Sequence, residues 1–200
     1  PTLPIYEEDN KTFSGPVGGM SDRQNPLREL YHNRDNRLKI WRIFGNAFVN
    51  ITPLKGLTLR SNFGIDYDAG FIHSVTYTWH SDVVNNSTPS ATVSQANDMK
   101  WTWSNTATYN FVLAAEHTFN LLAGLELYSQ KRDDFSSYAQ MYALETYKYM
   151  WPNASTGTQR ATGIEEGYNL VSLFGKMDYN WKYLLLASFT IRRDGSSRFG

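Results

Sequence analysis

The sequence predicts an all-β chain, a series of long antiparallel hairpins of the kind that cross a membrane as part of a β-barrel. Three observations support this prediction. Apolar and polar residues alternate with a period of two over stretches of about eleven to thirteen residues, which is typical of strands with one apolar face. Turns of about two to five residues alternate strictly with connections of roughly thirty residues. Aromatic residues gather toward the ends of the apolar faces.

The first part of the chain is predicted to be a loop followed by a hairpin. Residues 1–38 are mostly loop, because proline, glycine and polar residues dominate them. A short helix is predicted at residues 25–31, where Asn25 can cap the helix and Pro26 can occupy its first position. Residues 39–68 form the first hairpin, with a turn at residues 52–56.

Two further hairpins are predicted at residues 99–130 and 167–194, with turns at residues 114–117 and 181–182. The last strand begins at Tyr183 and is expected to leave the sheet at Asp194. Long loops are predicted at residues 69–98 and 131–166. In the first of them some alternation continues as far as Trp79, which leaves a strand-like base open, and a polar stretch without periodicity follows.

The pattern assigns each strand a lipid-facing and a lumen-facing side. Strands that cross a membrane need at least about 9 to 11 residues, whereas soluble sandwiches average about 5 to 6. The longest apolar run is about five residues, far short of the roughly 20 that a membrane helix needs. Leu59, Leu125 and Leu173 are predicted to face lipid, and Asn62, Glu126 and Ser172 are predicted to face the lumen.

Short turns are expected on the periplasmic side and long loops outside the cell. Two aromatic girdles are predicted, the first with Trp41, Tyr67, Trp101 and Trp103, the second with Phe111, Phe119, Tyr179, Trp181 and Tyr183.

Composition narrows the function classes. The formal net charge is +0, so no basic surface points to nucleic acid, and none is predicted as a partner. The chain has 0 cysteines, which excludes disulfides and thiolate metal sites. No catalytic constellation appears, so an enzyme is not predicted.

The ionisable residues give no clear metal or cofactor site, and neither is predicted. The 4 histidines are scattered, and His73 and His80 point to opposite faces of one extended segment. Asp66 and Asp68 lie on one face and leave a calcium site open as a minor alternative.

Two stretches carry a family resemblance. The last strand ends in RRDGSSRFG, and residues 25–64 read NPLRELYHNRDNRLKIWRIFGNAFVNITPLKGLTLRSNFG. Both resemble the barrel of SusC/RagA-like TonB-dependent outer-membrane transporters of Bacteroidetes, and the alternation between them extends the resemblance over nearly the whole chain.

The resemblance implies an outer-membrane location, contact with outer-membrane lipid, and TonB-dependent import of a large nutrient. Glycan uptake, the import of an oligosaccharide, is the first expectation, and a peptide is the second. Implied partners are a SusD-like surface lipoprotein and the TonB-ExbB-ExbD complex, which acts through a plug outside this chain. Because bacterial barrels have at least about 8 strands, residues 1–200 are expected to be part of a single barrel domain whose plug and remaining strands lie outside this chain.

Two groups of site residues are predicted. Tyr147, Tyr149 and Trp151, in the loop at residues 131–166, are candidates for substrate binding, because flat aromatic faces suit sugars and peptides. The alternative is that these rings pack the loop. The family motif is expected to be structural and consists of Arg192, Arg193, Asp194, Gly195, Ser196, Ser197, Arg198, Phe199 and Gly200. For the chain as a whole, the alternative is a soluble β-sandwich that binds carbohydrate.

Overall fold

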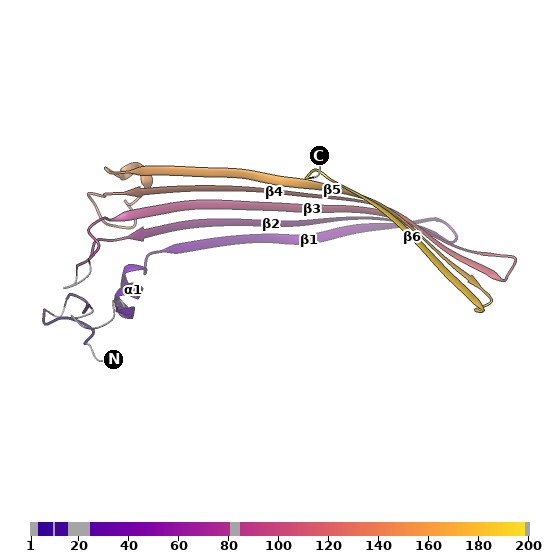
Figure 1. Ribbon diagram of the computed structural model, residues 1–200, viewed down its shortest axis with the longest axis horizontal. Helices are drawn as coiled ribbons and strands as arrows, with labels where there is room; N and C mark the ends of the chain where they lie inside the picture. The colour runs from indigo at the N-terminus through magenta and orange to yellow at the C-terminus, as the bar shows by residue number, and fades with distance from the viewer. Residues whose placement is uncertain (1–3, 10, 16–24, 81–84, 199–200) are drawn as a thin grey trace. The chain divides into compact units, whose positions relative to one another are not determined.

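The computed structural model describes residues 4–9, 11–15, 25–80 and 85–198. Six strands form one antiparallel sheet in sequence order, so each strand pairs with its neighbours in the chain (Figure 1). The all-β prediction is confirmed. The strands are β1 (Arg37–Leu54), β2 (Leu57–Thr76), β3 (Ser90–Leu113), β4 (His117–Gln140), β5 (Gln159–Trp181) and β6 (Leu185–Ser196).

One face of the sheet carries apolar side chains that no second layer covers. Ile43, Val49 and Leu173 are 60–63% exposed. A β-sandwich would bury such side chains between two sheets, but the described ranges form a single six-stranded sheet. The sandwich alternative is therefore wrong. An exposed apolar face is what the wall of a membrane barrel presents to lipid.

The strands are longer than predicted, and the long loops are correspondingly shorter. The predicted loop at residues 69–98 includes the end of β2 and the start of β3, and the predicted loop at residues 131–166 is strand except for residues 141–158. The physical reason is that polar side chains interrupt the apolar period at these strand ends and pair across neighbouring strands, although Val75, Ala91 and Ala139 form a small buried core there. Ser94 and Ser136 share a hydrogen bond of 2.8 Å, and Asn97 donates to Asp133 at 2.8 Å. The backbone pairing between strands continues there, but the sequence lacks the apolar alternation that would predict it.

Strand β6 also ends later than predicted. Asp194 pairs with Ser172 and Ser196 with Leu170, so the motif stays in the ladder instead of leaving it. At its other end, Tyr183 belongs to the turn at residues 182–184 and has a φ of 61°. The amide of Leu184 donates to the carbonyl of Trp181 at 2.8 Å and closes this turn. The prediction that β6 starts at Tyr183 is therefore wrong.

The predicted helix is confirmed as α1 (Pro26–His32), and the Asn25 side chain accepts a hydrogen bond from the amide of Leu27 at 3.0 Å. The Asn25 amide group also donates to the carbonyls of Ile5 and Ser14, which ties the preceding loop to the helix. Residues 16–24 of the predicted loop lie outside the described residues. A single-turn helix, η1 (Pro152–Ala154), is the other helical segment of the described chain.

The chain divides into two compact units. The first, Pro1–Ile40, Gly70–Ala96 and Asp134–Ile164, has a small core of Val75, Tyr77, Ala91, Ala139, Tyr142 and Met150. The second, Trp41–Ala69, Asn97–Asp133 and Glu165–Gly200, holds the strand segments with the apolar face and the three short turns.

Within the second unit, aromatic rings form a row next to the short turns. Phe111 on β3 stacks on Phe119 of β4 at 5.0 Å between ring centroids, and Phe119 lies 5.0 Å from Tyr179 of β5. The Nδ1 atom of His117 and the hydroxyl of Tyr179 share a hydrogen bond of 2.7 Å. These contacts match a girdle at one membrane surface, where rings span the boundary between hydrocarbon and water.

Candidate functional site

The loop between β4 and β5 is a folded segment of the first unit. The Met141 amide donates to the carbonyl of Pro89 at 2.8 Å, and the Thr156 amide donates to the carbonyl of Met141 at 2.9 Å. The Ser155 hydroxyl donates to the carbonyl of Gln140 at 2.6 Å. These bonds hold both ends of the loop against the strand ends, so its aromatic side chains have defined positions.

His73 on β2 lies at the centre of this loop. Its ring centroid is 4.3 Å from that of Tyr147 and 4.4 Å from that of Trp151. Its Nε2 donates to the carbonyl of Met150 at 2.9 Å, and both His73 and Met150 are buried. The loop therefore closes around the histidine, which has a packing role in this structure.

The predicted substrate-binding residues occupy different environments. Tyr147 packs against the buried core, whereas Trp151 is 40% exposed and its ring lies beside those of His73 and Phe71. Tyr149 is 50% exposed, and Lys148 Nζ lies 5.4 Å from its ring centroid. The structure thus brings Tyr147 and Trp151 together around His73 and leaves Tyr149 outside this group of rings.

Other residues of the loop region were not apparent as partners from the sequence. Glu145 accepts hydrogen bonds from the amide and the hydroxyl of Thr78 at 2.6 and 2.8 Å. Phe135 and Tyr138, which the sequence places among the aromatic residues of the predicted loop at residues 131–166, lie on β4 with exposed rings. Along the chain, 74 residues separate His73 from Tyr147 and 78 separate it from Trp151 (147 − 73 and 151 − 73), and nothing in the local sequence signals such a contact.

Tyr77 anchors the base of the loops. Its hydroxyl donates to Asp35 at 2.7 Å, and Asn36 accepts from the amide of Val75 at 2.7 Å. Burial, and next the hydrogen bond to Asp35, raise the pKa of Tyr77 to about 12. The neutral phenol is therefore the form that supports this contact.

The family motif makes contacts within the sheet. Arg192 donates to Asp194 at 2.8 Å and to the Ser172 hydroxyl at 3.0 Å. The guanidinium of Arg198 lies 4.2 Å from the ring centroid of Tyr168. The Ser197 amide donates to the carbonyl of Asn169 at 3.0 Å. Phe199 and Gly200 lie outside the described residues.

The carboxylates considered for calcium are paired with arginine. Arg42 donates to Asp66 at 2.9 and 3.1 Å and lies 3.5 Å from Asp68. Among the described residues, no group of three or more histidine, aspartate or glutamate side chains is placed to hold a metal ion. None of the described helices is long and apolar enough to span a membrane.

The fold and the exposed apolar face define the class of protein, a wall segment of an outer-membrane β-barrel. No family model matches the chain. It is similar to two TonB-dependent receptors of Formosa agariphila. Receptor P26 is 25% identical over 203 residues, covering 100% of this chain and 20% of the receptor. Receptor P39 is 28% identical over 195 residues, covering 89% of this chain and 17% of the receptor.

Solved structures agree. The structure of the RagAB peptide transporter matches with a TM-score of 0.81 at 21% identity, covering 96% of this chain and 21% of that one. The RagAB peptide importer in its open-open state matches with a TM-score of 0.79 at 22% identity, over the same shares. The resemblance predicted from the sequence and the outer-membrane location are confirmed. The chain spans about a fifth of the length of these relatives.

Proposed function

We propose that the protein imports a large nutrient across the outer membrane in a TonB-dependent manner, and that this chain forms part of its barrel wall and two of its outer loops. The similarity to TonB-dependent receptors over the full chain is the observation that carries the proposal. The partners follow from it: a SusD-like surface lipoprotein over the barrel, and TonB, ExbB and ExbD acting through the plug.

The substrate proposed first is an oligosaccharide. Exposed ring faces at the loop between β4 and β5, above all Tyr149 and Trp151, can stack on the apolar C–H faces of a sugar. Asn153 and Arg160 are exposed nearby in the same loop region and offer hydrogen-bond donors for hydroxyl groups. A peptide is the second candidate, because the RagAB structures similar to this chain are named as a peptide transporter and importer.

Replacing single aromatic residues of this loop by alanine distinguishes a role in ligand binding from a role in packing the loop. Tyr149→Ala removes an exposed ring and is expected to weaken ligand binding by up to about 2 kcal/mol with no change in thermal unfolding, as a binding residue does. Tyr147→Ala, the matched control, removes a ring that packs on the core and is expected to lower stability instead.

Two quantities are measured for the full-length protein with its lipoprotein. The first is its affinity for a panel of oligosaccharides and a panel of peptides, and the second is its melting temperature. Unchanged affinity for every ligand in Tyr149→Ala and Trp151→Ala would remove this loop from the recognition site. Preference for the peptide panel would decide between the two substrate classes.

A further inference from the structure

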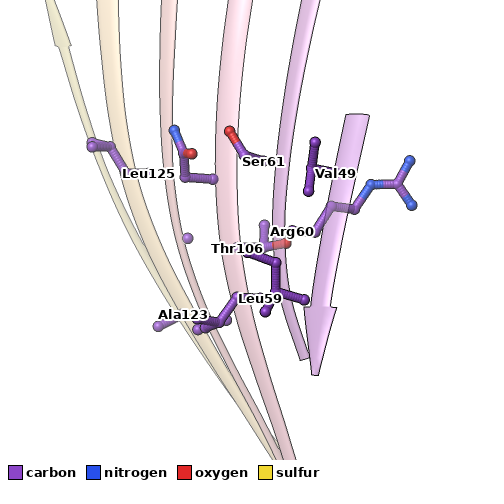
Figure 2. A pocket seen from close by; sticks show the side chains of 11 residues that line it. Val49, Leu59, Arg60, Ser61, Thr106, Ala123 and Leu125 are labelled. Carbon is purple, nitrogen blue, oxygen red and sulfur yellow. The ribbon is translucent and has the colours of Figure 1, made fainter. Parts of the chain in front are cut away.

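The apolar face of the second unit contains a depression of about 430 Å³. Its lining side chains come from four neighbouring strands, β1 to β4 (Figure 2). Around it lie Val49, Leu59 and Leu125, while small residues such as Ala107 and Ala123 form its floor. The side chain of Arg60 points away from the depression in Figure 2, and its guanidinium lies 4.3 Å from the ring centroid of Phe48.

Four polar residues, Arg60, Ser61, Asn105 and Thr106, interrupt the apolar lining, and strand alternation places Ser61 and Asn105 on the apolar face. Ser61 accepts a hydrogen bond from the indole nitrogen of Trp103 at 3.0 Å, so both side chains lie on this face. Asn105 follows Trp103 by two positions on β3 and therefore shares the face, where it is half-buried in the lining. Its carboxamide has no hydrogen-bond partner among the described residues. An unpaired amide is costly in hydrocarbon, so an outside group must meet it.

The two ends of the depression differ in chemistry. Ser61 and Asn105 lie toward the strand ends that carry long loops, and Leu59 and Ala107 lie nearer the short turns. In the orientation of the proposed function, on which this inference rests, the polar end faces the cell surface just below Trp103, which belongs to the aromatic girdle. That is the depth at which the acyl linkages of outer-leaflet lipids lie.

We propose that this depression holds an amide-linked acyl chain of an outer-leaflet glycolipid. The Asn105 carboxamide both donates and accepts, so it matches an amide linkage, which has an N–H and a carbonyl. An ester linkage only accepts hydrogen bonds, so it would leave the carboxamide oxygen of Asn105 without a donor. A flexible acyl chain can fill a concave floor of small residues, whereas the flat wall of a second barrel cannot enter it.

Two variants test the two halves of the site. Asn105→Leu removes the amide and suits a lipid-facing position, and Ala123→Leu fills the floor with a larger side chain. The control is Leu127→Phe on the same face of β4, outside the lining. The full-length proteins are purified from outer membranes in mild detergent, and mild alkali then releases the ester-linked chains so that the retained amide-linked chains can be measured by mass spectrometry.

Wild-type protein and Leu127→Phe are expected to retain amide-linked glycolipid. Asn105→Leu is expected to retain about tenfold less, the effect of one lost buried hydrogen bond, and Ala123→Leu similarly less. Adding purified lipid A to delipidated wild-type protein should raise its melting temperature more than phosphatidylethanolamine, whose chains are ester-linked.

Equal glycolipid retention by Asn105→Leu, or equal stabilisation by the two lipids, would overturn the proposal. It would also be overturned if Asn105→Leu dissociated an oligomer, because a second copy would then be the occupant. Import is measured separately on the same variants, so a protein that retains the glycolipid but imports neither ligand class would contradict the proposed function and leave this site standing.

Discussion

Gly124 on β4 shows how one absent side chain shapes the inner wall. A Cβ atom at this position would collide with the ring of Phe174 from β5, whereas a Cβ at Gly45 would meet nothing within 4 Å. Phe174 therefore lies over bare backbone, and its ring occupies the space that any other residue would fill.

We expect Gly124→Ala to destabilise the full-length barrel by about 1–3 kcal/mol, because the Phe174 ring must leave its position. Gly45→Ala, the control, should change the free energy of unfolding by less than about 0.5 kcal/mol. Unfolding in urea from detergent measures both. Combining Gly124→Ala with Phe174→Leu should recover most of the loss, and failure to recover it would contradict this packing.

Tyr77 links stability to pH through its hydrogen bond to Asp35. Its pKa is raised from 10.0 to about 12, so the folded state disfavours the phenolate. This stabilisation is complete below pH 10, the pKa of an unfolded tyrosine, and is lost as pH rises through about 12.

Tyr77→Phe keeps the ring and removes the titrating group. We expect the melting temperature of the wild-type protein to exceed that of Tyr77→Phe at pH 9, and the difference to shrink between pH 10 and 12. A difference that stayed constant over this range would show that the hydroxyl contributes nothing that depends on its protonation.

Strand β2 can be tested for the two environments that its faces meet. Leu59 lies on the apolar face, whereas Asn62 accepts a hydrogen bond from Asn46 on the opposite, polar face at 3.1 Å. Arginine in place of Leu59 should cost about 2–4 kcal/mol of stability in a bilayer, because its charge would enter hydrocarbon, and arginine in place of Asn62 should cost much less.

Refolding into lipid vesicles, followed by urea titration, compares Leu59→Arg with Asn62→Arg at the same ionic strength. Equal losses in the two variants would mean that both faces of β2 meet the same environment, and would contradict the barrel wall.

The orientation of the whole molecule follows from its unequal connections. The short turns of the sheet span residues 55–56, 114–116 and 182–184, whereas the connections from β2 to β3 and from β4 to β5 are longer. Barrels of this class place short turns in the periplasm and long loops outside the cell.

An epitope inserted near Ser87 in the full-length protein is therefore expected to be stained on intact cells. An epitope in the turn at residues 114–116 serves as the control and should be stained only after the membrane is permeabilised. The reverse result would invert the proposed orientation, together with the assignment of the loop between β4 and β5 to the cell surface.

Period-two alternation was enough to predict the class of fold, because it shows directly which side chains share an apolar face. It located the hairpins around residues 39–68, 99–130 and 167–194, where one face is apolar. The sequence also predicted helix α1, since Asn25 and Pro26 form a local start signal that needs no tertiary contact.

The ends of the strands and the pairing of the loop residues depend on contacts between distant segments, which the folded sheet alone reveals. β3 and β4 continue past the apolar band, where polar pairs such as Asn97 and Asp133 connect them. Hydrophobic periodicity does not predict strands in that region. The tilted contacts of Tyr147 and Trp151 with His73 join segments 74 and 78 residues apart, and no local pattern encodes such a contact. Strand faces are a property of neighbouring residues, whereas loop packing depends on which distant segments the sheet brings together.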